Sequence, residues 1–535
     1  MLAPQPAGAQ LLPDTGTTVQ VGGLRQQLEE LLAPPLAGGA ATAPGWTIVP
    51  SLAVEQRWTD HLLQPNGTDS AAFITTLTPA VLINGQTART STTVSFSPLL
   101  QYYSDNGAQN RIDQNFNAIS QISLLPDRLF LDLRGFATTQ PTGGGYGPPG
   151  TVAVARQGET QTMSFSAHPY LRERFGDLGS LELGATLAST SQNGLSYAQQ
   201  TGTPPPAGTS GGTQNFISQQ EYLSAKSGPD LGRTSVAVSI TANQSTGSGG
   251  INNSTRDEAS LTLGYAITRT LTALVSAGYD TLHYGGLPPY NQAGLEWSAG
   301  GRWDPNPDSN IIISYGRQYG VESAQVNATY APTARTRVYA RYSEGISTGL
   351  EQLLNAMNAS TLDPLGNPVG LLNATPLQIA NTFYGVQNYL ALVTSTSLTA
   401  VLLQDRDSFS ANLGRQERHQ LAAATNTTAT GPLDYAGLYG SLSWQHDLRP
   451  GLQSTLFAQW GTTTQSGQTG TTTTTGSASQ SYNTLVFSLR LSYVLSETIS
   501  TYAQYSWSSE GGQTLSGVPV NVPTSLVVIG ARKTF

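Results

Sequence analysis

Cysteine is absent from this chain of 535 residues, and so are long apolar runs. Without cysteine the chain has no disulfide framework, no thiol nucleophile and no thiolate metal site. No run of about 18 apolar residues occurs in the sequence, which excludes helices that cross a membrane. If the chain crosses a bilayer at all, it must do so with β-strands.

Charge is scarce as well. Charged residues make up 11% of the chain, against about 25% in a typical soluble domain. The basic residues number 25, of which only Lys226 and Lys533 are lysines, and no basic block occurs. With a net charge of −8 and no basic patch, the chain is not expected to bind nucleic acid.

What the chain has in abundance is glycine, with 57 residues, together with Thr, Ser, Gln and Asn. Disordered low-complexity chains and outer-membrane β-barrels share such a composition. Disordered segments contain few aromatic residues, whereas here aromatic residues reach 8% and recur along the whole chain. The composition therefore favours the barrel.

From Trp46 onward, segments of ten or more residues alternate between apolar and polar side chains, as half-buried strands do. The segment "TLVFSLRLSYVL" (484–495) is typical. One of its faces carries Leu485, Phe487, Leu489, Leu491 and Tyr493, and the other carries Ser488, Arg490 and Ser492. The pattern predicts strands with two chemically different faces.

The connections between these segments predict the architecture. Ten are short and turn-like: 84–87, 124–128, 175–180, 227–233, 267–270, 304–309, 331–336, 403–408, 446–452 and 495–498. Between them lie connections that are usually longer, such as 140–150, 193–212 and 462–480. Short periplasmic turns alternating with long extracellular loops are typical of bacterial outer-membrane barrels. We therefore predict an all-β fold: a closed antiparallel transmembrane β-barrel of about 22 strands, within a range of 20–24, with both termini on the periplasmic side.

A water-soluble β-protein is the alternative, with the apolar face in a core. A soluble sheet of this size would curl or split, whereas a bilayer requires closure because every backbone group must be paired within the sheet. All seven tryptophans fall at predicted strand ends, where interfacial girdles lie. They are Trp46, Trp58, Trp297, Trp303, Trp444, Trp460 and Trp507.

Two regions stand outside the predicted strands. Residues 1–45 are expected to be a signal-peptide remnant, with "AGA" before Gln10 as its cleavage signature, and a periplasmic segment with one short helix at 24–33. Residues 46–535 form the barrel. Its longest connection, 346–387, is expected to be extracellular and partly helical.

Phe535 is the last residue and is in phase with Val527, Ile529 and Ala531. A terminal aromatic residue on an alternating strand resembles the signal that the barrel assembly machinery reads, and we expect Phe535 to serve as that signal. The simpler alternative is an anchor at the membrane interface. Both interpretations require outer-membrane lipid as the surroundings.

The sequence offers no catalytic, cofactor or metal site. The five histidines (61, 168, 283, 419 and 446) are scattered without metal-ligand spacing. No G-x-S-x-G pattern and no phosphate-binding glycine loop occur. An outer-membrane hydrolase is therefore the least supported alternative, and we expect that the protein is not an enzyme and needs no cofactor.

Charged residues on the polar faces are predicted to line the lumen. A wide lumen needs polar walls to hold water, and this explains most of them. The functional alternative is a track that touches a passing sugar or polymer, because the planar donors of arginine suit the carboxylates of an acidic polysaccharide. The candidates are Glu55, Arg57, Asp132, Arg134, Arg172, Arg174, Glu182, Arg256, Glu258, Glu296, Arg302, Arg341 and Arg490.

The expected width of the pore raises the question of closure. Barrels of about 22 strands are normally plugged, and only 45 residues precede the first predicted strand. This argues against a TonB-type siderophore receptor. We therefore expect 346–387, together with 140–159, to fold inward and to narrow the channel.

Four segments carry a resemblance to a known family: "WTIVPSLAVEQRWTDH" (46–61), "FITTLTPAVLINGQTARTSTTVSFSP" (73–98), "RVYARYSEGIST" (337–348) and "LTAVLLQDRDSFSANLGRQER" (398–418). They resemble outer-membrane β-barrel proteins associated with PEP-CTERM/exosortase exopolysaccharide systems. The chain departs from that pattern at His61, where the family has Asn after Thr-Asp. No catalytic residue is carried over.

The resemblance implies a channel or scaffold of the Gram-negative outer membrane that serves exopolysaccharide export. The implied partners are the barrel assembly machinery, the polysaccharide and periplasmic export components. The alternative is a general or sugar-uptake porin, through which small hydrophilic solutes diffuse.

Overall fold

The structure is a computed structural model. It describes residues 45–62, 71–104, 107–141, 159–194, 214–247, 253–285, 289–348, 351–352, 360–362, 368–370, 390–422, 434–471, 474–513 and 519–535. The predicted helix at 24–33, the loop segment 142–158 and most of 346–387 lie outside these residues. The predictions made for them stay predictions.

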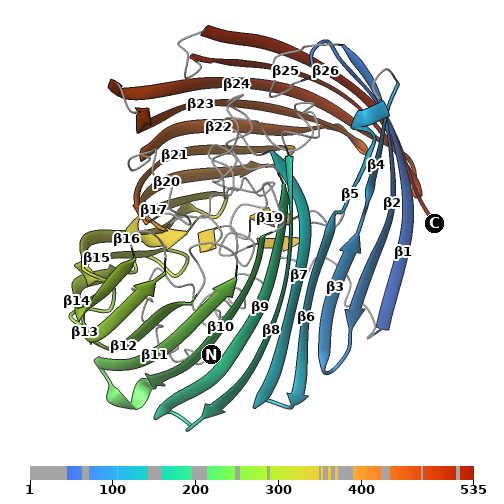
Figure 1. Ribbon diagram of the computed structural model, residues 1–535. Coiled ribbons are helices and arrows are strands. Elements are labelled where there is room, and N and C mark those ends of the chain that lie inside the picture. Colours follow the sequence, from blue (N-terminus) through green and yellow to red (C-terminus); the bar gives the residue numbers. More distant parts are fainter. Residues whose placement is uncertain are drawn as a thin grey trace.

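The strands form one closed ring (Figure 1). β1 (Gly45–Thr59) pairs with β2 (Ala72–Gln86) on one side and with β26 (Pro519–Thr534) on the other, and every pairing in the ring is antiparallel. A closed ring has no edge strand, so every ladder group finds its partner within the sheet, as a bilayer demands. The predicted barrel of 22 strands is thereby confirmed.

The remaining strands follow in chain order. They are β3 (Thr90–Phe96), β4 (Leu99–Tyr103), β5 (Arg111–Asp113), β6 (Phe116–Leu125), β7 (Leu129–Pro141), β8 (Glu159–Arg174), β9 (Gly179–Gly194), β10 (Gln214–Ser227), β11 (Thr234–Gly247), β12 (Ser254–Ala266), β13 (Leu271–Tyr284), β14 (Tyr290–Trp303), β15 (Asn310–Gln318), β16 (Val321–Thr333) and β17 (Thr336–Thr348). After these come β20 (Leu390–Gln404), β21 (Asp407–Ala422), β22 (Asp434–Arg449), β23 (Leu452–Thr471), β24 (Thr474–Ser496) and β25 (Ile499–Gln513). A separate small hairpin consists of β18 (Ser360–Leu362) and β19 (Pro368–Gly370).

Two strands of the ring are interrupted. β3 and β4 both pair with β2, while β6 pairs with β3 and β5 pairs with β4. The break between β3 and β4 falls at Ser97 and Pro98, and proline has no N–H to donate to a ladder. Counting each interrupted strand once reduces the 24 segments of the sheet to 22 positions in the ring.

All ten predicted turns lie between paired strands at one end of the barrel, which we call the turn end. The opposite end, the loop end, carries the other connections. Not all of these are long, since the connection between β15 and β16 is only residues 319–320. One prediction about them is wrong: in the Thr-rich stretch 462–480, residues 462–471 and 474–480 are strand and not loop. They continue β23 and β24 as a hairpin, because threonine is β-branched and favours strands.

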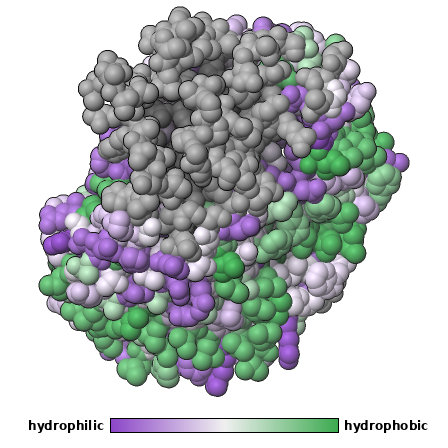
Figure 2. All heavy atoms as spheres, in the orientation of Figure 1, coloured by the Kyte–Doolittle hydropathy of each residue, from purple (hydrophilic) through white to green (hydrophobic). Residues whose placement is uncertain are grey.

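The outer face of the barrel carries an apolar belt. On β24 the residues that point outward from Leu485 to Tyr493 are apolar or aromatic, and beyond them Asn483 and Ser481 are polar and exposed. This stretch of nine residues matches the roughly 9–11 that a tilted transmembrane strand needs. In the view of Figure 2, hydrophobic residues gather over the outer faces of the strands. Among the described residues, no helix is long and apolar enough to cross a membrane.

The tryptophans mark the limits of this belt only in part. Trp46 and Trp303 stand at or beside strand ends, as predicted, but Trp297, Trp460 and Trp507 lie well inside β14, β23 and β25. β23 and β25 continue beyond the belt toward the loop end. The next outward residues after Trp460 are threonines, so this tryptophan stands at the edge of the apolar surface and not at the end of the strand.

Candidate functional site: the lumen wall

The inner face of the barrel is mostly polar, and the alternation of exposed and less exposed residues along the strands places all thirteen predicted lumen positions on it. Each alternates with neighbours on the outer face, as Glu296 does between the exposed Leu295 and Trp297. Arg256, Glu258 and Glu296 are buried, whereas Arg341 and Arg490 remain exposed inside the barrel. Placement alone does not assign these side chains a role in transport, which stays a prediction.

One group of polar side chains crosses the seam where the barrel closes. Glu55 on β1 accepts a hydrogen bond from Arg57 Nε (2.9 Å) and another from the hydroxyl of Tyr502 on β25. The guanidinium of Arg490 on β24 lies 4.1 Å from the centre of the Tyr502 ring. The contacts join β1, β24 and β25 on the lumen side of the seam.

A second group lines β8, β9 and β10. Arg172 Nε donates to Glu182 Oε2 (2.9 Å), and the hydroxyl of Tyr222 donates to Glu182 Oε1 (2.7 Å). The ring of His168 lies between those of Tyr170 and Tyr222, and its Nε2 is 2.9 Å from the Tyr222 hydroxyl. These rings are buried, so the group braces the wall, while the side chains of Arg172 and Glu182 stay partly exposed.

Gly184 makes room for the Tyr222 ring. A Cβ atom at Gly184 would lie 2.6 Å from Tyr222 Cε1, well inside van der Waals contact. Similar pairs of a glycine with a cross-strand aromatic ring occur at Gly440 with Trp460 and at Gly530 with Tyr502. Some of the abundant glycines therefore serve the strands and not the loops, which the sequence-based interpretation missed.

At the loop end, Arg256 of β12 reaches across the barrel interior. Its Nη2 donates to the carbonyl oxygen of Ile346 on β17 (3.0 Å) and lies 3.7 Å from Glu351 Oε1. The guanidinium also lies over the Tyr319 ring, 5.1 Å from its centre. In the ring, β13 to β16 separate β12 from β17. Arg256 therefore connects the end of β17 to the inner face of β12, four strands away from direct pairing.

Glu351 lies in a short helical turn that Thr348 caps. The N–H of Thr348 donates to Glu351 Oε2 (2.7 Å), and the N–H of Glu351 donates to Thr348 Oγ1 (3.2 Å). This reciprocal pattern is a capping box. It fixes the Glu351 carboxylate where Arg256 meets it.

The opposite side of this segment is held by β21. Arg418, buried in the wall, donates from Nη2 to Gln352 Oε1 (2.7 Å), and Gln416 Nε2 donates to the same oxygen (3.2 Å). The described residues at the start of the predicted loop, 346–348 and 351–352, therefore lie between side chains of β12 and β21. Sequence reasoning did not single out Arg418 or Gln352, since a polar residue at a strand end carries no distinctive pattern.

The connection between β15 and β16 also bends toward this group. The N–H of Tyr319 donates to Asp280 Oδ2, and Gln318 Nε2 donates to Glu258 Oε2 (3.0 Å). Burial raises the pKa of the Tyr319 hydroxyl, and the nearby carboxylates raise it further, against the opposing effect of Arg256. Tyr319 is therefore a neutral donor, and it donates to Glu258 Oε2 at 3.3 Å.

Apolar side chains gather at the loop end as well, where a purely polar inner face was expected. One buried cluster joins strand tips from β10 to β21: Phe216, Leu282, Tyr284, Tyr319, Ile346, Leu390 and Ala422. A second joins residues near the seam: Leu62, Ala72, Ile74, Tyr103, Leu526 and Val528. Alternation alone places such residues on the inner face but cannot reveal that they meet one another.

Within the described residues, no group of three or more His, Asp or Glu side chains is arranged to hold a metal ion. The His-carboxylate contacts that do occur, such as His446 Nδ1 with Asp407 Oδ1 (2.8 Å) and His168 Nδ1 with Asp132 Oδ2 (3.9 Å), are separate pairs. The chemistry that the described wall offers is hydrogen bonding and charge.

No protein-family model and no curated protein matches the chain. Among solved structures, the chain is similar to the FrpB iron transporter from Neisseria meningitidis, with 9% identity and a TM-score of 0.48, over 95% of this chain and 83% of that one. It is also similar to a ferric enterobactin receptor mutant from Pseudomonas aeruginosa, with 11% identity and a TM-score of 0.42, over 91% and 80% of the two chains. A siderophore receptor from Acinetobacter baumannii matches with 8% identity and a TM-score of 0.42, over 91% and 81%. No conclusion about the cargo of this chain follows from likenesses this distant.

Proposed function

We propose that the chain is a conduit in the outer membrane of a Gram-negative bacterium, through which an exopolysaccharide passes without any chemistry by the protein. The barrel spans the bilayer with its apolar belt, with the turn end toward the periplasm and the loop end outside. The choice of cargo rests on the resemblance of residues 46–61, 73–98, 337–348 and 398–418 to exopolysaccharide-associated barrels.

The observation that carries the proposal is the polar lining of a closed barrel. Charged side chains, which are costly to bury unpaired, are placed on the inner face, and several pair there, as Arg57 does with Glu55 and Arg172 with Glu182. Arg341 and Arg490 remain exposed within the lumen, and their planar donors suit hydroxyl and carboxylate groups of a sugar chain. The passage itself needs no energy from the protein, since the wall offers weak and repeated contacts.

The second candidate is an uptake porin for sugars or small anions. The tie between Arg256 and Ile346 favours it, because strand tips that lean together across the loop end leave less room for a polymer than for a small solute. The two candidates differ in the solute that passes through the lumen: a polymer in the first and a small sugar or anion in the second.

The test is a deletion of the gene in its own host, with two readouts. Polymer export predicts loss of surface polysaccharide with unchanged entry of small sugars, and expression of the chain restores the polymer. The uptake porin predicts the reverse pair of results. A deletion strain that keeps both its surface polysaccharide and its normal entry of small sugars would refute both candidates.

Variants of the exposed arginines make the test specific to the lumen. We expect Arg341→Gln together with Arg490→Gln to lower the amount of exported polymer while the barrel still assembles. Arg335→Gln is the matched control, because Arg335 lies in a turn outside the lumen and pairs with Asp405 at 3.3 Å. Equal export by both variants would remove the arginines from the proposal.

A further inference from the structure

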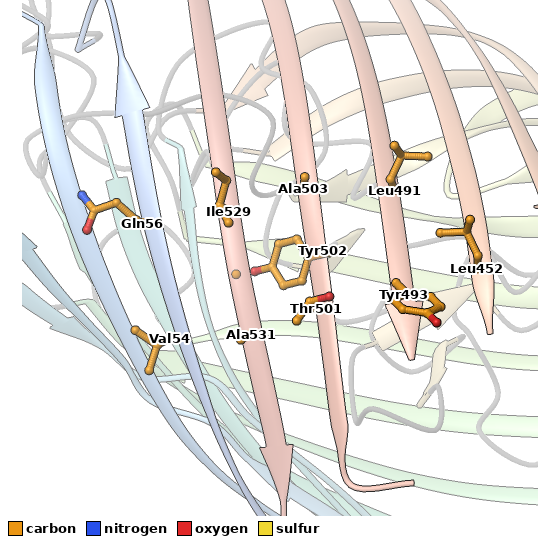
Figure 3. A pocket seen from close by; sticks show the side chains of 11 residues that line it. Val54, Gln56, Leu452, Leu491, Tyr493, Thr501, Tyr502, Ala503, Ile529 and Ala531 are labelled. Atoms are coloured by element: carbon orange, nitrogen blue, oxygen red, sulfur yellow. The ribbon is translucent and has the colours of Figure 1, made fainter. Parts of the chain in front are cut away.

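The outer face of the barrel is hollowed beside the seam. A depression of about 540 Å³ lies where β24, β25, β26 and β1 run side by side. Figure 3 shows its lining, with Val54 on one side, Leu491 and Tyr493 on the other, and the small side chains of Ala503 and Ala531 between them. Most of the lining side chains belong to the outer face, which opens the depression toward lipid, whereas Tyr502 turns its hydroxyl to Glu55 on the lumen side.

The strand register explains why the surface is hollow here. Tyr493 pairs with Thr501, Thr501 pairs with Ala531, and Ala531 pairs with Val54, so two small residues stand in one row between two larger ones. In the next row toward the loop end only Ala503 is small, and it stands between Leu491 and Ile529. Small residues on adjacent strands leave a groove that runs along the strands. Transmembrane strands are tilted by about 35–45° from the bilayer normal, so an acyl chain in this groove would take up that tilt.

Cations stand at the turn-end limit of this groove. Lys533 follows Ala531 on the outer face of β26, and its Nζ lies 5.2 Å from the centre of the Phe535 ring. Arg449, which pairs with Leu452, lies with its guanidinium 5.2 Å from the centre of the Tyr493 ring. Among the described residues, neither cation forms a salt bridge.

The two cations flank the turn-end limit of the groove. Arg449 ends β22 and Lys533 lies in β26, so four strand spacings, or about 19 Å, separate their backbones. The Arg449 side chain crosses part of this span, because its guanidinium reaches the Tyr493 ring on β24. A phosphodiester between them would be within reach of both flexible side chains. Lysine near a bilayer surface favours anionic lipid by about 1 kcal/mol for each charge, which makes these positions selective.

We propose that this groove binds one phospholipid of the leaflet on the turn side, with an acyl chain over Ala503 and Ala531 and an anionic headgroup between Lys533 and Arg449. Apolar walls with charge at one end only are complementary to a lipid and not to a second barrel, whose facing belt would be apolar throughout. The site bridges β26 and β1, which pair over nine residues against fifteen for β25 and β26. A bound lipid therefore also supports closure of the ring.

The test uses native mass spectrometry of the full-length chain, released from vesicles of equal parts phosphatidylglycerol and phosphatidylcholine with identical acyl chains. The wild-type chain is expected to retain one phosphatidylglycerol in preference to phosphatidylcholine. Lys533→Gln and Arg449→Gln are each expected to lower this preference about fivefold, which corresponds to about 1 kcal/mol. Arg269→Gln, in the turn between β12 and β13, is the control and should leave it unchanged.

A second pair of variants tests the groove itself. Ala503→Phe fills it and should abolish retention of the lipid, while Ala277→Phe, on the outer face of β13, should not. If Lys533→Gln hinders assembly, the loss of preference for phosphatidylglycerol in Arg449→Gln alone tests the headgroup contact. Equal retention of both lipids by the wild-type chain would overturn the proposal. So would a dimer that Ala503→Phe separates, because the groove would then belong to a second copy.

Discussion

Replacement of Arg256 by glutamine should release the strand tip that this arginine holds. Arg256 makes one charge-assisted hydrogen bond to the Ile346 carbonyl, a cation–π contact with Tyr319 and a contact with the Glu351 carboxylate. Such a hydrogen bond is worth about 1.5–3 kcal/mol and such a ring contact about 0.5–2. The Glu351 contact adds little, because that carboxylate is 43% exposed.

Glutamine can restore one neutral hydrogen bond worth about 1 kcal/mol, so the net loss is about 3 kcal/mol. A loss of that size shifts a local opening equilibrium by roughly a hundredfold. Hydrogen exchange of the reconstituted protein measures it directly. We expect protection of the Ser347 and Thr348 amides to fall by about two orders of magnitude, while the amides of β24 are unaffected.

The same variant should raise single-channel conductance in a planar bilayer, since the tip no longer leans across the lumen. Arg302→Gln is the control, because Arg302 also lies on the inner face but pairs with Asp304 at the turn end, 2.9 Å away. Unchanged exchange in Arg256→Gln would refute the tie itself. Faster exchange with unchanged conductance would refute its role in narrowing the passage.

Three further predictions concern the wall and its ends. Gly184→Val should push the Tyr222 ring off Glu182 and destabilise the folded barrel by about 1–3 kcal/mol, measured by urea unfolding in vesicles, with Tyr222→Phe as the milder comparison. Asp60→Asn should destabilise the barrel at neutral pH. Burial alone would raise the pKa of Asp60, but hydrogen bonds from Ser525 and the neighbouring His61 hold it below its usual range. The stabilisation is therefore present above the unfolded pKa and is lost as pH falls through the folded one, so the two proteins should become equally stable in strong acid. Replacing Phe535 with serine should lower the amount of barrel in the outer membrane if this residue is read during assembly, and equal amounts would assign it only an interfacial role.

The strand pattern could be predicted from sequence because the membrane imposes it. Alternation in a segment such as 484–495 follows from lipid on one side and water on the other, and the short turns follow from the hairpin connections. The ends of β23 and β24 could not be predicted, because glycine and threonine repeats suit a loop and a long hairpin equally well in composition. Only the cross-strand ladder of the structure separates the two.

The lumen positions followed from the same alternation, but their grouping did not. The sequence places Glu55, Arg57 and Arg490 on inner faces, while the contact through Tyr502 depends on closure of a ring whose ends are 490 residues apart (Gly45 to Phe535). The contact between Arg418 and Gln352 was missed for a related reason. It exists only where the segment after β17 folds against β21, and the sequence does not show where that segment lies. Long-range contacts of this kind leave no local signal.

Contact between the apolar belt and lipid is the central claim, and quenching of tryptophan fluorescence by brominated acyl chains tests it most directly. Trp297 and Trp460 are 40% and 42% exposed on the outer face, within reach of chains in the surrounding bilayer. Reconstitution into vesicles with bromines along the acyl chains should quench most of the emission seen in unbrominated lipid. Emission that stays unquenched, from a chain that remains monodisperse in buffer without detergent, would contradict the account.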